Sequence, residues 1–278
     1  MTVLILGETD DPHVERVTKY LNDYIILDRE TIANDVTVTN DLVETAVRVE
    51  GEPLHNIHSV YWRDIDFDSF GPFDQEFANT AAHMQLFFNA FPDARWCNPW
   101  SAFVEHQTKI KQYERITCLK PATLITSDYD EAYEFFSEFP AVAVKPVAGG
   151  QYTKKIKKKK KLSKIKLPYP MCFQEYIEGM NVRTFVIGKQ VFAAEIISDD
   201  VDFRTGEFVY KPFYLDAERH QQCIDITKTL GYEWTAIDWI LREGNWYFLE
   251  ANFSPMFGYF EDSTNFPIAE SLANLLIQ

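Results

Sequence analysis

The sequence predicts an α/β (α+β) protein of more than one domain, and three observations lead to this class. A strand, a helix and a second strand follow one another at the N-terminus, with the strands at Thr2–Leu6 and Tyr24–Leu27, as in a parallel βαβ unit. Two apolar runs joined by Gly188-Lys189-Gln190 have the pattern of an antiparallel hairpin. The chain has 278 residues, 46% of them hydrophobic, so it is long enough for two domains with a sizeable core.

Residues 1–98 are predicted to form an N-terminal α/β domain. Its first helix is capped by Asp11 or Asp10 and runs from Pro12 to about Leu21. Residues 28–57 are weakly patterned and are expected to form loop and short strands. The remaining elements predicted here are a strand at Ser59–Trp62 and a helix at Phe73–Phe91, and the domain boundary is placed near Pro99.

Residues 99–278 are predicted to form a second domain with two parts, one at about 120–180 and the other at about 181–278. A helix at Ser101–Cys118 leads into it, and Asp199–Tyr214 is expected to be an irregular connection. The predicted strands are Ala122–Ile125, Ala141–Lys145, Met171–Ile177, Val182–Ile187 and Val191–Ile197, and the predicted helices are Asp128–Phe139, Ala217–Leu230 and Ile268–Ile277.

The charge is strongly acidic but uneven. The net charge is −15, although residues 154–166, the lysine-rich segment, hold nine lysines and no acid. An acidic body repels nucleic acid, so we expect no nucleic-acid partner. The apolar runs are too short for a membrane span, and the four cysteines have no paired spacing. These features predict a cytoplasmic protein with reduced thiols and no membrane partner.

The stretch Trp234–Phe257 predicts a hairpin that carries polar groups. Asp238 lies in its first strand, and Glu250 and Asn252 lie at the end of its second strand, two residues apart and therefore on one face. Two carboxylates and an amide oxygen would suit Mg²⁺. The alternative is a solvated polar face on an antiparallel pair.

Two lysines occupy positions suited to phosphate. Lys145 ends a strand just before Gly149 and Gly150, and backbone amides beside a strand-end lysine can hold phosphate oxygens. Lys109 lies on a helix just ahead of the strand that begins near Pro121. An ordinary turn and a surface lysine are the respective alternatives.

The segment Phe173–Gly179 begins as a strand and then turns. Its backbone can pair with the edge of an adenine ring, while Glu178 or Asn181 can reach ribose hydroxyls; a plain sheet edge is the alternative. Arg183 and Arg204 are cations in an acidic protein, and a guanidinium suits carboxylate or phosphate. For both arginines the alternative is a surface salt bridge.

From about Asn98 to its C-terminus, the chain resembles the ATP-grasp superfamily. The resemblance implies an ATP-grasp fold with an N-terminal pre-grasp α/β domain, a central small α+β domain and a C-terminal antiparallel sheet. The last of its motifs is similar to the E-x-N-x-S-P segment of the ribosomal-protein glutamate ligase branch. In chain order the motifs are Lys109, Pro121-Ala-Thr123, Lys145 with its glycines, Gln174-Glu175-Tyr176-Ile177, Asn181-Val-Arg183, Asp238 and Glu250-Ala-Asn252-Phe-Ser-Pro255.

What the resemblance implies is a carboxylate ligase. ATP-grasp enzymes transfer the γ-phosphoryl group of ATP to a carboxylate, and a nucleophile then displaces phosphate from the acyl phosphate. The implied cofactors are ATP and Mg²⁺, with two ions expected. The metal ligands would be Asp238, Glu250 and Asn252.

The resemblance also implies roles for the cations. Lys109 and Lys145 would hold the α- and β-phosphates, Arg183 would stabilise the acyl phosphate, and Arg204 would hold the substrate carboxylate. The remaining nucleotide contacts that it implies are Gly149, Gly150, Gln174, Glu175, Tyr176, Ile177, Glu178 and Asn181.

A narrower resemblance is to the graspetide synthetases, the macrocyclases that cross-link ribosomal peptides such as microviridins. It implies a precursor peptide as substrate, cross-linked from Asp or Glu side chains to Ser, Thr or Lys. The lysine-rich segment would then be a positive lid or a dock for an acidic peptide; a solvated hairpin is the alternative. The resemblance rests on Asp11-Pro-His13, Ser59-Val-Tyr-Trp-Arg63, Asp202-Phe-Arg204 and Phe260-Glu261 with Thr264.

Two other functions stay open at this point. One is a glutamate or amino-acid ligase that modifies a protein or a small molecule. The other is a non-catalytic nucleotide-binding regulator, although such proteins usually lose a metal ligand and all three are present here. The sequence defines neither the acceptor nor the bond formed, and it allows a homodimer without specifying the oligomeric state.

Overall fold

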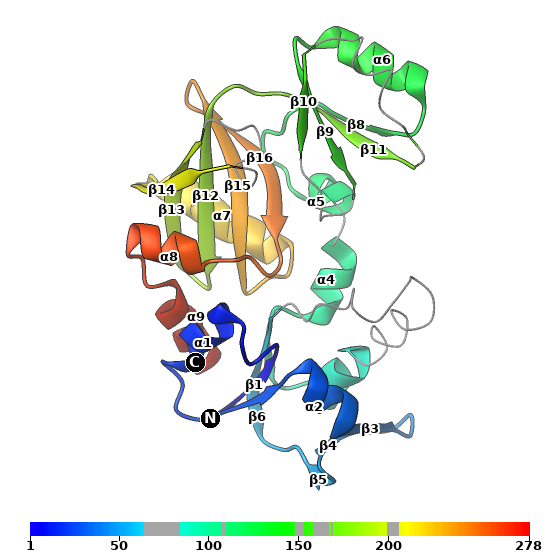
Figure 1. The fold of residues 1–278 in the computed structure, drawn as a ribbon, viewed down its shortest axis with the longest axis vertical. Coiled ribbons are helices and arrows are strands. Elements are labelled where there is room, and N and C mark those ends of the chain that lie inside the picture. Colours follow the sequence, from blue (N-terminus) through cyan, green and yellow to red (C-terminus); the bar gives the residue numbers. More distant parts are fainter. Residues whose placement is uncertain (64–83, 107–108, 148–152, 158–166, 168, 199–205) are drawn as a thin grey trace.

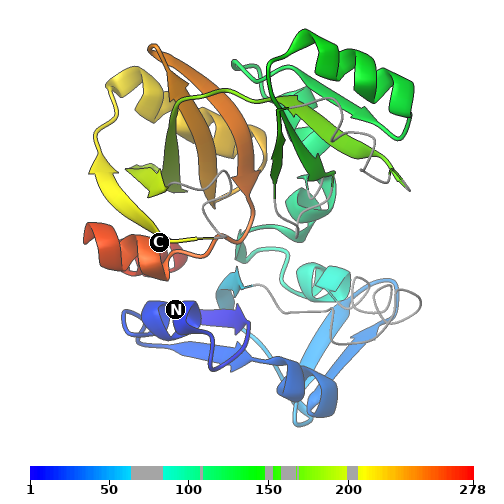
Figure 2. The same cartoon turned by 45° about the horizontal axis from the view of Figure 1, so that its top comes forward.

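The computed structural model describes residues 1–63, 84–106, 109–147, 153–157, 167, 169–198 and 206–278. Three sheet-based parts are arranged around α4 (Trp100–His106) and α5 (Lys109–Arg115), as Figures 1 and 2 show. Of the helix that the sequence pattern predicts over Ser101–Cys118, residues 101–106 and 109–115 are helical, residues 107–108 lie outside the described part, and residues 116–118 are not helical. Within the described ranges, every helix is too short or too polar to cross a lipid bilayer.

The N-terminal part is built on a parallel sheet in the order β2-β1-β6-β7. Asp11 caps α1 (Pro12–Thr18) by accepting a hydrogen bond from the His13 amide, and Pro12 starts the helix. The predicted βαβ unit is therefore present. Its strands are β1 (Thr2–Leu6), β2 (Tyr24–Leu27), β6 (Ile57–Trp62) and β7 (Arg95–Cys97).

Residues 28–57 form short strands, as the sequence pattern predicts, and also a short helix that it does not predict. Asp28 caps a short helix, α2 (Arg29–Asn34), by accepting from the Thr31 amide. Of the helix predicted at Phe73–Phe91, residues 84–90 are helical and residues 73–83 lie outside the described part. A small antiparallel sheet follows α2, formed by β3 (Val36–Asn40), β4 (Thr45–Val49) and β5 (Glu52–Pro53).

The central part is a small antiparallel sheet covered by one helix. The strand order is β10-β9-β11-β8, and α6 (Tyr129–Glu138) buries Ala132 and Phe136 against it. Asp128 caps this helix as predicted, accepting from two amides of its first turn. The strands are β8 (Thr123–Thr126), β9 (Val142–Pro146), β10 (Lys154–Ile156) and β11 (Met171–Glu175).

The C-terminal part is an antiparallel sheet in the order β14-β13-β12-β15-β16. α7 (Ala217–Thr229) packs on one face, and α8 (Gly258–Thr264) and α9 (Ile268–Leu276) pack on the other. β14 lies where the sequence pattern predicts only an irregular connection. The strands are β12 (Met180–Ile187), β13 (Gln190–Ser198), β14 (Phe208–Phe213), β15 (Trp234–Arg242) and β16 (Asn245–Asn252).

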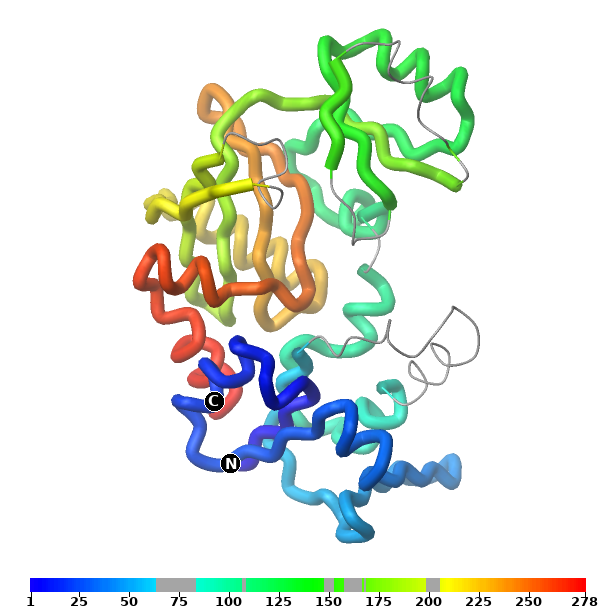
Figure 3. The backbone as a smooth tube through the Cα atoms, viewed as in Figure 1, coloured from blue at the N-terminus to red at the C-terminus, as the bar shows by residue number. Residues whose placement is uncertain are grey.

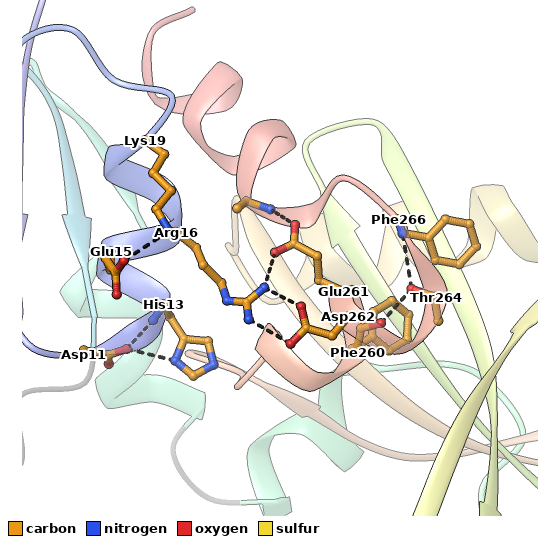
Figure 4. A network of polar contacts seen from close by, with 11 residues as sticks. Asp11, His13, Glu15, Arg16, Lys19, Phe260, Glu261, Asp262, Thr264 and Phe266 are labelled. Carbon is orange, nitrogen blue, oxygen red and sulfur yellow. Dashed lines mark hydrogen bonds and ion pairs between the residues drawn. The ribbon is translucent and has the colours of Figure 1, made fainter.

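The end of the chain returns to its beginning. Figure 3 shows α9 beside α1, and the Ser59 hydroxyl of β6 donates to the Leu276 carbonyl at 2.7 Å. In Figure 4, Arg16 of α1 reaches α8, where it donates two hydrogen bonds of 2.8 Å to Asp262 and one of 3.1 Å to Glu261. The N-terminal part is therefore joined to the C-terminal helices by polar contacts as well as by the shared core.

Asn98 joins the linker before α4 to the C-terminal hairpin. Its side-chain amide donates to the carbonyls of Trp234 and Phe253 at 2.8 and 2.7 Å. Its oxygen accepts from the amides of Glu233 and Trp234 at 2.7 and 3.0 Å. Asn98 is fully buried, and its bonds to the carbonyl and amide of Trp234 are buried as well, so it satisfies backbone groups that are shielded from water.

We expect Asn98→Ala to destabilise the fold by about 3 kcal/mol, because it leaves buried backbone groups without partners. Chemical denaturation followed by tryptophan fluorescence would measure the change. Asn89→Ala is the matched control, since Asn89 is exposed and should change stability by less than about 0.5 kcal/mol. Equal stabilities of the two variants would contradict this role of Asn98.

Candidate active site

The three predicted metal ligands share one face of the C-terminal sheet. Asp238 of β15 lies opposite Glu250 of β16, and Asn252 lies opposite Ala236. Residues directly opposite in an antiparallel pair point to the same face, as do residues two apart on one strand. Asn252 donates to an Asp238 oxygen at 3.3 Å, so these side chains are neighbours.

Arg183 lies across from Asp238 on β12 and forms a two-pronged ion pair with it. Its Nε and Nη2 atoms donate to the two Asp238 oxygens at 2.7 and 2.8 Å. A further contact of 3.3 Å joins Arg183 to the Tyr210 hydroxyl. Burial alone would lower the pKa of Arg183, but the Asp238 carboxylate raises it well above its usual range. Arg183 is thus a fixed cation beside the predicted metal ligands.

Lys109 of α5 reaches the same face. Its ammonium lies 2.7 Å from the Glu250 carboxylate, whose side chain is 26% exposed. Burial would raise the pKa of Glu250, but Lys109 and Lys145, with a smaller contribution from Arg183, lower it to about 2. Glu250 is therefore ionised at neutral pH and surrounded by cations.

Lys145 lies on β9 of the central sheet, and a residue of the same sheet fixes its side chain. It is 6% exposed and donates to the Gln174 side-chain oxygen at 2.9 Å. The Gln174 amide in turn donates to the hydroxyls of Tyr113 and Thr123 at 2.9 and 3.0 Å. Gln174 therefore orients Lys145 through its side chain, a role different from the adenine contact expected for this segment.

The predicted adenine segment leaves the central sheet at the end of β11. The Glu175 amide donates to the Ala122 carbonyl at 2.8 Å and the Tyr176 amide to the Ala141 carbonyl at 3.1 Å. These two amides hold the turn together and are not available to a nucleotide. The segment continues through Ile177, which is buried, to the exposed Glu178.

Lys155 of β10 covers this segment. Its ammonium lies 3.4 Å from the centre of the Tyr176 ring and 3.0 Å from Glu178. Asn181, at the start of β12, lies on the same face as Arg183 because the two are two residues apart in the strand. Glu178 thus lies within the short link between the central and C-terminal sheets, and Asn181 lies in the strand that follows it.

Some predicted residues lie outside the described part of the chain. They are Gly149, Gly150, Arg204 and residues 158–166 of the lysine-rich segment.

Two polar residues of α5, Gln112 and Tyr113, belong to the site and carry no predicted role. Gln112 exchanges hydrogen bonds with the backbone of Ala251, and the Tyr113 hydroxyl donates to the Leu249 carbonyl. Their spacing from Lys109, three and four residues on, places all three on one helix face. That spacing is the signal in the sequence that could have identified them.

The donor set fits Mg²⁺. Across the described ranges, no group of three or more His, Cys, Asp or Glu side chains gathers as a metal site. The face of the C-terminal sheet offers two carboxylates and one amide, all of them oxygen donors, which magnesium prefers. A site with few protein ligands leaves room for phosphate oxygens and water, as is usual for magnesium bound with a nucleotide.

Carboxylates beside partly buried cations on one sheet, with a lysine from a second small sheet, suit an ATP-dependent carboxylate ligase. The chain belongs to the RimK-like ATP-grasp domain family, whose model matches residues 107–276. The predicted ATP-grasp fold and ligase class are confirmed.

Solved structures resemble the chain over its whole length. The ATP-grasp ligase PsnB, complexed with a minimal precursor, has a TM-score of 0.86 and 26% identity, with 99% of this chain and 97% of PsnB covered. The macrocyclase MdnC of Microcystis aeruginosa, bound with precursor peptide MdnA, has a TM-score of 0.81 and 21% identity, with 100% and 99% covered.

A third structure is a RiPP-associated ATP-grasp ligase of Chryseobacterium gregarium, with a TM-score of 0.75, 22% identity, and 99% and 96% of the two chains covered. The predicted resemblance to peptide macrocyclases is thus confirmed. For the two structures that are less than 25% identical to this chain, the resemblance is one of fold alone. A comparison with curated protein sequences found no match.

The ion pairs of Glu250 should make the stability of the fold depend on pH. Its pKa lies near 2, below its ordinary value of 4.5, so its contacts stabilise the fold above about pH 4.5 and are lost as the pH falls toward 2. Between these values wild type should lose about 2 kcal/mol more stability than Glu250→Gln, allowing for partial exposure. Denaturation at a series of pH values would measure this, and parallel curves would contradict it.

Proposed function

We propose that this protein is an ATP-dependent ligase that cross-links a ribosomally made precursor peptide through Asp or Glu side chains. The observation that carries the proposal is the convergence of Lys109, Arg183 and Lys145 on the face with Asp238 and Glu250. A ligase that activates a carboxylate has to bring that anion to the anionic triphosphate, and the fixed cations lower this electrostatic cost.

The nucleotide side of the site would use residues from both sheets. Lys145 and Lys109 would hold the α- and β-phosphates, and Gln174 would orient Lys145 by the hydrogen bond already in place. Adenine would lie against the segment from Glu175 to Glu178, and Asn181 would contact the ribose. Mg²⁺ on Asp238, Glu250 and Asn252 would neutralise phosphate charge, and two ions are proposed.

Lys109 has to change partners in this scheme. Its ammonium contacts Glu250, and a phosphate oxygen would replace that carboxylate as its partner. Arg183 differs, because both of its prongs lie on Asp238 and its strand is the direct neighbour of β15. We infer that Arg183 stays on Asp238 and that Lys109 moves.

The reaction would proceed in two steps. A carboxylate oxygen of the peptide attacks the γ-phosphorus, the bond to the β-γ bridging oxygen breaks, and ADP leaves. A hydroxyl or amine of the peptide then attacks the carbonyl carbon, loses its proton, and phosphate leaves with the electron pair of the broken C–O bond. Arg183 would stabilise charge on the acyl phosphate, and Arg204 would hold the substrate carboxylate.

A peptide substrate is supported by the structures that the chain resembles. PsnB, at 26% identity, is complexed in one structure with precursor peptide PsnA2 and AMPPNP, and in another, at 27%, with a minimal precursor, Mg and ADP. We propose that an acidic part of the precursor docks near the lysine-rich segment. The reaction would take place in the cytoplasm, where ATP and newly made peptides are both available.

The second candidate is a ligase that adds glutamate or another amino acid to a protein or small molecule. The match to the RimK-like domain model is compatible with it, because that match does not specify the acceptor. Mass spectrometry separates the two functions. Cross-linking removes one water per bond from the peptide, whereas amino-acid addition increases the mass of the acceptor.

We expect Asp238→Asn to reduce peptide-dependent ADP formation by at least about 100-fold, because it removes a metal ligand and the partner of Arg183. A coupled ADP assay with the encoded precursor peptide would measure the rate. Glu243→Gln, in the exposed turn of the same hairpin, is the control and should keep wild-type activity. Turnover by Asp238→Asn at the wild-type rate would refute the metal assignment.

A further inference from the structure

The strand that carries two of the proposed metal ligands is an edge strand. β16 is the last strand in the order β14-β13-β12-β15-β16, so among the described residues no further strand pairs with its outer backbone groups. Such groups need other partners when they are removed from water. On β16 these partners come from α5 and the chain that follows it, where the Leu119 carbonyl accepts from the Phe248 amide at 2.9 Å.

Gln112 takes the place of a neighbouring strand at Ala251. The Ala251 amide donates to the Gln112 side-chain oxygen at 2.9 Å, and the Gln112 side-chain amide donates to the Ala251 carbonyl at 2.9 Å. This reciprocal pair reproduces the two hydrogen bonds that paired residues of antiparallel strands exchange. Gln112 is 5% exposed and also donates to the His106 carbonyl at 3.1 Å, so its amide orientation is fixed.

Tyr113 holds the residue on the other side of Glu250. The register of β15 and β16 shifts between Asp238 and Trp239, because Asp238 pairs with Glu250 while Trp239 pairs with Phe248. Leu249 is therefore the extra residue of a bulge, and its carbonyl lacks a ladder partner there. The Tyr113 hydroxyl supplies one at 2.7 Å.

Three successive residues of β16 are thus held by one face of α5. Tyr113 holds Leu249, Lys109 holds the Glu250 side chain, and Gln112 holds Ala251. Lys109 would leave Glu250 when phosphate arrives, whereas the contacts of Gln112 and Tyr113 are to backbone and do not depend on that exchange. The backbone on both sides of Glu250 therefore has a support that is independent of the charge at the site.

We propose that Gln112 is a positioning residue for metal binding, since it fixes the backbone of Ala251 and so the directions in which Glu250 and Asn252 point. This inference rests on the proposed Mg²⁺ site of the ATP-dependent ligase. Tyr113 has a second connection, because its hydroxyl also accepts from Gln174, which holds Lys145. Gln112 acts on the metal side alone, and Tyr113 joins the metal side to the phosphate side.

The test measures binding of a fluorescent ADP analogue to the full-length protein, once in EDTA and once over a series of Mg²⁺ concentrations. Mg²⁺ is expected to increase the affinity for the ADP analogue. For Gln112→Ala we expect the Mg²⁺ concentration that gives half of this increase to rise by about 10-fold, as for other residues that orient metal ligands. The affinity in EDTA should stay within about 2-fold of wild type, because Gln112 contacts no phosphate-binding lysine. Lys111→Ala, on the exposed face of the same helix, should change neither value.

Two more variants keep the test decisive. Gln112→Met keeps the length of the side chain without its hydrogen bonds, and it should reproduce the Mg²⁺ effect if Gln112→Ala does not fold. Tyr113→Phe should weaken nucleotide binding in EDTA as well, because it removes a partner of Gln174. The proposal would be overturned if the folded Gln112 variants required the same Mg²⁺ concentration as wild type. It would also be overturned if they lost as much affinity for the ADP analogue in EDTA as in Mg²⁺. Wild-type binding that ignores Mg²⁺ would instead overturn the metal assignment of the proposed function.

Discussion

The antiparallel register between β15 and β16 is the constraint on which the rest of the site depends. It places Asp238 opposite Glu250, and Asn252 lies two pairs further along, opposite Ala236, so that all three side chains point from one face. The bulge at Leu249 is part of that register, because in a regular ladder Leu249 would lie opposite Asp238 and Glu250 would point to the opposite face. Arg183, on the next strand, then pairs with Asp238 directly across the ladder.

Charge balance follows from this geometry. Two partly buried carboxylates on one face would repel each other, and each instead has a close cation, Arg183 for Asp238 and Lys109 for Glu250. The cations come from different kinds of element, a neighbouring strand and a separate helix. The first is fixed by the ladder, whereas the second can move without breaking a sheet, and this difference matches the two roles that we propose for them.

Much of the fold could be predicted from sequence because its signals are local. Asp11 and Asp128 cap helices where the pattern predicts them, and the hairpin around the Glu243-Gly244 turn has the expected strands. β14 could not be predicted, because an edge strand of mixed polarity takes its stability from β13. The spacing of Gln112 from Lys109 is a local signal, but its role depends on a partner, Ala251, that is 139 residues away in the chain.

Arg63 has a consequence for the evolution and engineering of this chain. It is buried at the end of β6, donates to Asp11 at 3.0 Å, and donates to the carbonyl and hydroxyl of Ser254 at 2.9 and 2.7 Å. Ser254 lies two residues after Asn252, so the loop leaving the proposed metal site ends on a cation of the N-terminal part. The two halves therefore cannot be exchanged freely among relatives, and a chimera would need to inherit Asp11, Arg63 and Ser254 from the same parent.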